Sequence, residues 1–325
     1  MSDLPLTLAC WDYDRTRPLI DGRVKAKGID LDVKMLRPRV MFPRMLEDKE
    51  FHASELSLAS YASLLGRGDT SFRALPVAVS KIFRHSCIYI RPGSGIKKPE
   101  DLRGKRVGTT QWGSTAAVFM KGMIHDEYGV APSDMHWFMG GLDAPTQAPL
   151  IPFTPPPGVT LELLPEGKTL EAMMEAGELD ALFSIYFPKI FLKGSDNCKR
   201  LWPNFKEVEI AYYKKTKIFP IMHTIAMRSD VIDAHPWAAK SLYEALKEAR
   251  DMAVEGLYDT DALRLALPFL LDHVEENWRV FGEDFWAYGF EANRPTLAAL
   301  GRYVYEQGLS PRIVKPEEIF MPGLD

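Results

Sequence analysis

The run Phe219-Pro220-Ile221-Met222-His223-Thr224-Ile225-Ala226-Met227 is almost continuously apolar. Its length and composition predict a buried strand over residues 221–227. This strand follows two segments that each alternate strand and helix signals, and we expect it to carry the chain back into the first of them. A chain that leaves one α/β unit, builds a second and then returns gives a two-lobed α/β protein with a discontinuous first lobe.

The residues that precede this strand divide into two units. In the first hundred, the pattern predicts strands at Leu6–Cys10 and Ile29–Leu36, and a helix around Phe42–Asp48. The polar, proline-containing stretch at residues 97–105 indicates entry into the second unit. The predicted lobes are therefore residues 1–100 plus 217–325, and residues 101–216.

Local signals place several other elements. Ser114 should cap a helix that ends near Gly129. The proline-rich segment at residues 145–158 is incompatible with a helix or a central strand and predicts a surface loop. A C-terminal helical layer is predicted from three patterns: Ala238–Val254, Asp261–Leu271 and Thr296–Gln307.

Composition excludes several classes of protein. The chain has 325 residues, 46% of them apolar, enough for a sizeable core. The 40 basic and 44 acidic residues give a net charge of -4 and no basic cluster, which argues against nucleic-acid or membrane partners. The N-terminus lacks a signal-peptide core, so we expect a cytoplasmic protein. Three widely spaced cysteines predict reduced, mostly buried thiols.

Several segments resemble those of 4,5-dihydroxyphthalate decarboxylases, and the similarity spans nearly the whole chain. The segments are Tyr13-Asp14-Arg15-Thr16-Arg17, Ser54-Glu55-Leu56-Ser57-Leu58-Ala59-Ser60-Tyr61, Phe83-Arg84-His85-Ser86-Cys87, Phe219-Pro220-Ile221-Met222-His223-Thr224 and Trp286-Ala287-Tyr288-Gly289. Two loops that should face the cleft depart from the family pattern, at residues 110–114 and 184–188.

The resemblance implies a type II periplasmic-binding-protein-like fold, with two interlobe crossovers and a ligand cleft between the lobes. It implies the cofactor-independent decarboxylation of a hydroxylated aromatic dicarboxylate, as in the conversion of 4,5-dihydroxyphthalate to protocatechuate. The alternative is a solute-binding protein that closes on a small organic acid without changing it, because the fold alone does not separate the two. A thiamin-pyrimidine type of enzyme would need a site rich in histidine and cysteine, which the sequence does not show.

Removing a carboxylate from an aromatic ring requires a cation for the retained carboxylate and a proton donor at the ring carbon. The segment Arg84-His85-Ser86 offers a guanidinium, an imidazole and a hydroxyl at the start of a predicted strand. We predict that Arg84 and Ser86 bind substrate and that His85 is catalytic. The alternative is a surface arginine beside a capping serine and an incidental histidine.

Two further residues are candidates for proton transfer. His223 interrupts the apolar run and is either a proton donor or a core histidine bonded to backbone. Glu55, with Ser57 nearby at a strand end, could accept a phenolic proton, or it could form a cap or a salt bridge.

The remaining candidates are predicted to bind substrate. Asp14, Arg15 and Arg17 follow the first strand, a position that borders the ligand crevice in open α/β sheets, although they could equally form a solvated turn. Residues at the start of a helix have free backbone donors that can bind an anion. Here they are Gln111, Trp112, Ser114 and Thr115. Tyr186 could stack on a ring of the substrate, or it could be structural.

The histidines lack metal-binding spacing, so no metal or other cofactor is expected to be required. A divalent cation held by Asp12, Asp14 and Glu55 stays open. The aromatic residues near the C-terminal helices could form a contact in a homo-oligomer, or they could belong to the core: Trp278, Phe281, Phe285 and Trp286.

Overall fold

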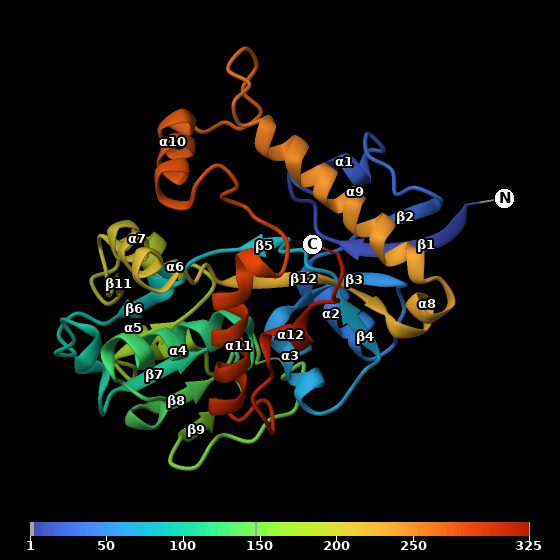
Figure 1. Cartoon of the computed structure of the whole chain (residues 1–325). Coiled ribbons are helices and arrows are strands. Elements are labelled where there is room, and N and C mark those ends of the chain that lie inside the picture. Colours follow the sequence, from blue (N-terminus) through green and yellow to red (C-terminus); the bar gives the residue numbers. More distant parts are fainter. Residues whose placement is uncertain (1–2, 147, 325) are drawn as a thin grey trace.

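The computed structural model describes residues 3–146 and 148–324. It shows two lobes that lie side by side, and each lobe is built on a six-stranded sheet (Figure 1). The two-lobed α/β architecture predicted from the sequence is confirmed.

The first sheet contains three parallel strands at one side and an antiparallel strand from late in the chain. Its strands are β1 (Leu4–Cys10), β2 (Ile29–Met35), β3 (Ala53–Ser57), β4 (Phe72–Ala74), β5 (Ser80–Lys81) and β12 (Ile221–Arg228). Their order is β2-β1-β3-β12-β4, and β5 also pairs with β12. Strand β12 is therefore the predicted return into the first lobe, and it lies directly beside β3.

Helices cover this sheet. They are α1 (Arg17–Ile20), α2 (Pro38–Leu46), α3 (Leu58–Gly66), α8 (Ser229–Ala234) and α9 (Pro236–Glu255). All five residues of β3 are buried, because β1 and β12 pair with its two edges and helices pack on the sheet. A polar residue in β3 must therefore find its partners inside the protein.

The second sheet has the order β11-β6-β10-β7-β8-β9. Its strands are β6 (Ile88–Ile90), β7 (Arg106–Thr109), β8 (His136–Met139), β9 (Thr160–Leu163), β10 (Ala181–Phe183) and β11 (Lys199–Arg200). The helices of this lobe are α4 (Thr115–Tyr128), α5 (Leu170–Glu175), α6 (Lys189–Leu192) and α7 (Phe205–Thr216).

Strand β6 moves the first lobe boundary. We predicted that the chain enters the second lobe near residue 100, but β6 at residues 88–90 already pairs with β10 and β11 of the second sheet. The first crossover therefore lies between β5 and β6, at residues 82–87. Local composition indicated only the polar stretch after the crossover, because pairing of β6 with strands about 90 to 110 residues away leaves no local signal.

The C-terminal layer contains α10 (Leu270–Phe281), α11 (Arg294–Glu306) and α12 (Pro316–Ile319). Helix α11 packs against both α3 and α4 and so ties the two lobes together (Figure 1). The helix predicted at Asp261–Leu271 is wrong, since residues 261–269 carry no regular structure and α10 begins at Leu270. Pro268 removes a backbone donor there, and the leucines at 263, 265 and 267 recur every second residue, which is not a helical period.

Helix α4 forms as predicted. The Ala117 amide donates to the Ser114 side chain, 3.3 Å away, and Gly129 ends the helix with a left-handed φ of 66°. The three cysteines are buried free thiols, also as predicted. None of the helices in the described ranges is long and apolar enough to cross a membrane.

The proline-rich loop contacts the end of α3, the loop before α4 and the C-terminal layer. The backbone oxygen of Pro152 accepts a bond from the Arg67 guanidinium, and Phe153 stacks on Trp112 with ring centroids 6.1 Å apart. Gly308, with φ of 75°, faces the loop, and a Cβ there would lie 2.2 Å from the backbone oxygen of Thr154. Only glycine allows this close approach.

Candidate active site

A buried carboxylate lies at the centre of the first lobe. Glu55 in β3 is 0% exposed, and three donors surround its two oxygens. The Trp11 amide donates to Oε2 at 2.9 Å, the Tyr13 hydroxyl donates to Oε1 at 2.7 Å, and Nδ1 of His223 lies 2.6 Å from Oε1. The sequence identified Glu55 and His223 separately, and the fold joins them.

Sheet register brings the two residues together. Glu55 pairs with Ile225 of β12, and His223 lies two residues along the same strand, so it is a diagonal neighbour on the same face of the sheet. The imidazole keeps 22% of its side-chain surface exposed, and Phe42 packs edge-on against it at 5.1 Å between centroids. His223 is therefore the member of the pair that solvent or a ligand can reach.

The contacts of Glu55 favour its ionised form. Burial by itself raises the pKa of this carboxyl, but hydrogen bonds from His223 and Tyr13, together with the charge of His223, bring the pKa below its ordinary value. Burial and the nearby negative charge raise the pKa of the Tyr13 hydroxyl, so Tyr13 remains a proton donor to the carboxylate.

Because Glu55 has no exposed surface, a substrate cannot contact its oxygens directly. We expected this residue to accept a phenolic proton itself, but the structure places it behind His223 and Tyr13. A carboxylate on Nδ1 of a histidine fixes the orientation and tautomer of the ring and stabilises its protonated form. Nε2 is then the nitrogen left for a substrate.

The loop after β1 supplies an arginine beside this cluster. The Arg15 guanidinium lies between the rings of Tyr13 and Trp286, at 4.2 and 4.5 Å from their centroids, and Nε donates to the Val79 carbonyl at 2.5 Å. The indole of Trp286 donates to the Ala78 carbonyl at 2.9 Å. Tyr13 and Trp286 were not among the predicted site residues, although both lie in segments that resemble the decarboxylase family.

The other charged residues of this loop face outward. Asp14 pairs with Arg15 at 2.9 Å and is 46% exposed. Arg17 forms an ion pair with Asp12 and is 49% exposed. The structure thus brings Arg15 to the Glu55 cluster and leaves Arg17 in a surface pair.

Arg84 lies at the first crossover, next to β12. Its Nε is 3.4 Å from the sulfur of Met222, and its Nη1 is 3.7 Å from the sulfur of Cys87. In the described part of the chain these sulfurs are the only hydrogen-bond partners of the guanidinium, and sulfur is a weak acceptor. A partly buried guanidinium with such partners retains its capacity to bind a carboxylate.

His85 and Ser86 lie on the other side of the crossover, beneath α7. The His85 ring is 1% exposed and lies 5.2 Å from the centroids of both Trp202 and Tyr212. Neither of its nitrogens has a hydrogen-bond partner in residues 3–146 and 148–324, although Nδ1 is 3.7 Å from Oε1 of Glu209. The Ser86 amide donates to that same carboxylate at 3.4 Å. The fold does not bring these two residues to the Glu55 cluster.

Ser57 and Thr115 form a buried contact between the lobes. Their hydroxyl oxygens are 2.9 Å apart, and the Ala59 amide donates to Thr115 Oγ1 at 3.0 Å. Ser57 is also the register partner of His223. The start of α4 is therefore fixed against the end of β3, next to the histidine.

Residues just before α4 have different positions. The Trp112 side chain is 0% exposed, stacks on Phe153, and donates to the Gln307 carbonyl at 2.9 Å, so it belongs to the core and not to the cleft where we predicted it. Ser114 caps the helix. Gln111 is partly exposed in the same loop.

Tyr186 spans the lobes at the surface. It is 38% exposed, and its hydroxyl accepts a bond of 2.8 Å from Nε of Arg39 in α2. The guanidinium also lies 4.4 Å from the centre of the Tyr186 ring. Tyr186 therefore contacts the opposite lobe.

No group of three or more His, Cys, Asp or Glu side chains in the described ranges could hold a metal ion. The carboxylates that the sequence offered as metal ligands have other partners. Asp12 pairs with Arg17, Asp14 pairs with Arg15, and Glu55 belongs to the buried cluster.

Comparison with known proteins identifies the family of the chain. A model of the family described as NMT1/THI5 like matches residues 25–147. The chain is 36% identical over 323 residues to a 4,5-dihydroxyphthalate decarboxylase from Comamonas testosteroni, covering 99% of this chain and 98% of that protein. It is 35% identical over 202 residues to a 4,5-dihydroxyphthalate decarboxylase from Pseudomonas putida, covering 62% of this chain and 78% of that protein.

A solved structure shows the same fold. The periplasmic aliphatic sulphonate binding protein SsuA from Escherichia coli aligns with a TM-score of 0.55 and 11% identity, covering 99% of both chains. This likeness confirms the predicted periplasmic-binding-protein-like architecture. The near full-length identity to a curated relative shows that the chain belongs to the 4,5-dihydroxyphthalate decarboxylase family.

Proposed function

We propose that this protein removes a carboxylate from a hydroxylated aromatic dicarboxylate without oxidation, converting 4,5-dihydroxyphthalate to protocatechuate. The observation that carries the proposal is the reachable imidazole of His223 held at 2.6 Å by a buried carboxylate. Family membership supplies the substrate class, since the relatives carry this activity in their names.

The reaction needs a proton donor at the ring carbon and a group that stabilises the dearomatised intermediate. As the bond between the ring and the carboxylate breaks, carbon dioxide leaves and the ring carbon gains a proton. In 4,5-dihydroxyphthalate each carboxylate has a hydroxyl para to it. Loss of a proton from that hydroxyl stabilises the dearomatised intermediate.

In this proposal His223 supplies the proton through Nε2. Glu55 holds the ring by Nδ1 and fixes its orientation, so Nε2 is the nitrogen directed to the substrate. His85 remains the second candidate for this role.

Two arginines bind the carboxylates. Arg84 faces only weak sulfur acceptors in the described part of the chain and so can bind the retained carboxylate through its planar fork. Arg15, stacked on the Tyr13 ring, adds positive charge beside the Glu55 cluster. Ser57 and Thr115 fix the start of α4 against this site, and Gln111 is the partly exposed side chain of the same loop.

The proposal requires no metal and no organic cofactor. Activity should therefore survive exhaustive treatment with EDTA, and restoring magnesium or manganese should not raise it. Activity that disappears with EDTA and returns with one of these ions would show that a divalent cation takes part.

A cytoplasmic homo-oligomer is part of the proposal. Three buried, unpaired thiols fit a reducing compartment, and exposed apolar side chains at and before α10, such as Phe269 and Trp278, suit a subunit contact. Cell fractionation and light scattering of the purified protein test these two points.

The test of the activity is direct. Purified protein is incubated with 4,5-dihydroxyphthalate, and carbon dioxide and protocatechuate are followed by mass spectrometry. His223→Gln is compared with His136→Gln, since His136 also pairs with a carboxylate, Glu162 at 2.6 Å, but lies exposed on β8. Loss of product in the first variant alone supports the proposal, whereas tight binding of intact substrate by the wild type would indicate a solute-binding protein.

A further inference from the structure

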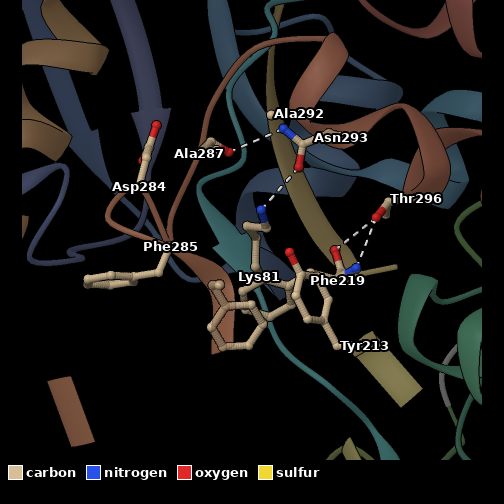
Figure 2. A pocket seen from close by; sticks show the side chains of 10 residues that line it. Lys81, Tyr213, Phe219, Asp284, Phe285, Ala287, Ala292, Asn293 and Thr296 are labelled. Carbon is tan, nitrogen blue, oxygen red and sulfur yellow. Dashed lines mark hydrogen bonds between the residues drawn. The ribbon is translucent and has the colours of Figure 1, made fainter. Parts of the chain in front are cut away.

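A cavity of about 300 Å³ lies beside the first crossover, between β5 and the C-terminal layer. Four aromatic rings line it, those of Tyr213, Phe219, Phe281 and Phe285, and Lys81 from β5 extends into it (Figure 2). Its lining includes none of the residues of the Glu55 cluster. The activity proposed above therefore leaves this cavity without a role.

Lys81 is held in one place. Its residue exposure is 8%, and its ammonium group donates to Oδ1 of Asn293 at 3.0 Å and lies 4.7 Å from the centre of the Phe219 ring. Asn293 is itself fixed, because its Nδ2 donates to the carbonyl of Ala287 at 3.2 Å (Figure 2) and to that of Gly289 at 2.8 Å. A lysine nitrogen has up to three hydrogens, so at least one direction stays available for a ligand.

Burial also changes the chemistry of this amine. Desolvation lowers the pKa of Lys81 to about 7, against a smaller opposing effect of Asp284. Roughly half of such amines are neutral at pH 7, compared with fewer than about one in a thousand for a lysine with a pKa near 10.4. A neutral amine is a nucleophile, and desolvated lysines are the ones that form Schiff bases with carbonyl compounds.

The lining selects the class of ligand. A carboxylate ligand would lose its hydration among the four aromatic rings of the wall. A cation would find one carboxylate in the lining, that of Asp284, and this carboxylate is already paired with Arg250. A neutral ring with a carbonyl group suits both the apolar wall and the amine.

We propose that this cavity is a second ligand site, in which Lys81 forms a reversible imine with a small aromatic aldehyde. The lone pair of the neutral amine attacks the carbonyl carbon, and the carbinolamine that forms then loses water. The nitrogen gains a double bond to carbon, the bond from carbon to oxygen breaks, and the two amine hydrogens leave with that oxygen. No oxidant or reductant is consumed.

The test traps the imine on the wild-type protein. The protein is incubated with benzaldehyde and sodium cyanoborohydride at pH 7, and labelled peptides are quantified by mass spectrometry. Lys34 and Lys240, which are 49% and 69% exposed, serve as internal controls. We expect Lys81 to be labelled at least about tenfold faster than either control, with a rate that saturates as the benzaldehyde concentration rises.

Lys81→Arg should lose this fast, saturable labelling while the exposed lysines keep theirs. Labelling of Lys81 at or below the rate of Lys240 would overturn the proposal, and so would a rate that stays linear in aldehyde. The wild-type peptide map decides the question even if the variant does not fold. Decarboxylation is measured separately, so a negative result here does not bear on the proposed activity.

Discussion

Nδ1 of His223 lies 2.6 Å from Oε1 of Glu55, and this glutamate has no solvent-exposed surface. The two residues are 168 positions apart in the chain and meet because β12 returns to pair with β3. A charge that is buried needs partners, and here the partners are an imidazole, a phenol and a backbone amide. The arrangement resembles other sites in which a carboxylate orients a histidine for proton transfer.

His223→Gln should lower kcat by about 10²- to 10⁴-fold, because removal of a positioned general acid has effects of this size. Substrate binding should change little, since glutamine can still donate to Glu55. Steady-state kinetics with 4,5-dihydroxyphthalate give the two constants separately, and His136→Gln is the matched control. Equal kcat in the two variants would remove His223 from the chemistry.

His85→Gln distinguishes the two histidines. The His85 ring is 1% exposed and packs against Trp202 and Tyr212. We therefore expect this change to lower the midpoint of thermal unfolding and to have little effect on kcat. Thermal unfolding is measured alongside turnover at a temperature where the variant is folded. A fully folded variant without turnover would instead make His85 the catalytic histidine.

Glu55→Gln should lower the free energy of unfolding at neutral pH and remove part of its dependence on pH in the acidic range. The pKa of Glu55 in the folded protein lies below its ordinary value of 4.5. The unfolded state therefore binds the proton first as the pH falls, so the stabilisation is complete above about pH 4.5 and is lost below it. Unfolding curves from pH 3 to pH 7 should show that the difference in unfolding free energy between wild type and variant becomes smaller as the pH falls.

Arg84→Met should raise KM by about 10- to 100-fold, the effect of losing a charged hydrogen bond to a carboxylate. Arg23→Met is the control, because Arg23 forms an exposed pair with Asp21 at 2.7 Å. KM is obtained from initial rates of product formation. An unchanged KM in the Arg84 variant would show that another cation holds the carboxylate.

Lys81→Met should change how stability depends on pH in the alkaline range. The folded pKa of about 7 lies below the ordinary value of 10.5, so between these values the unfolded state binds more protons. This group therefore makes folding more favourable as the pH rises from 7 to 10.5, by up to about 1.4 kcal/mol per pH unit. The difference in unfolding free energy between wild type and variant should follow this trend, and a difference independent of pH would contradict it.

Part of the fold could be predicted from local pattern. Helix α4 runs between the predicted cap at Ser114 and the predicted end at Gly129, and β12 falls on the strand predicted over residues 221–227. These features depend on side chains close together in sequence. The helix predicted at Asp261–Leu271 did not form. The leucines there are exposed, so tertiary packing does not stabilise a helix in this segment.

The sequence by itself determined the class of fold, the return of the chain through β12 and the residue types that chemistry on an aromatic acid requires. Only the tertiary structure decided which of them meet: Glu55 with His223 and Tyr13, and Arg15 with Trp286. It also placed Trp112 in the core and Lys81 in an aromatic cavity. The physical reason is that helix and strand signals are local, whereas the burial and pairing of a polar group depend on strands far apart in the chain.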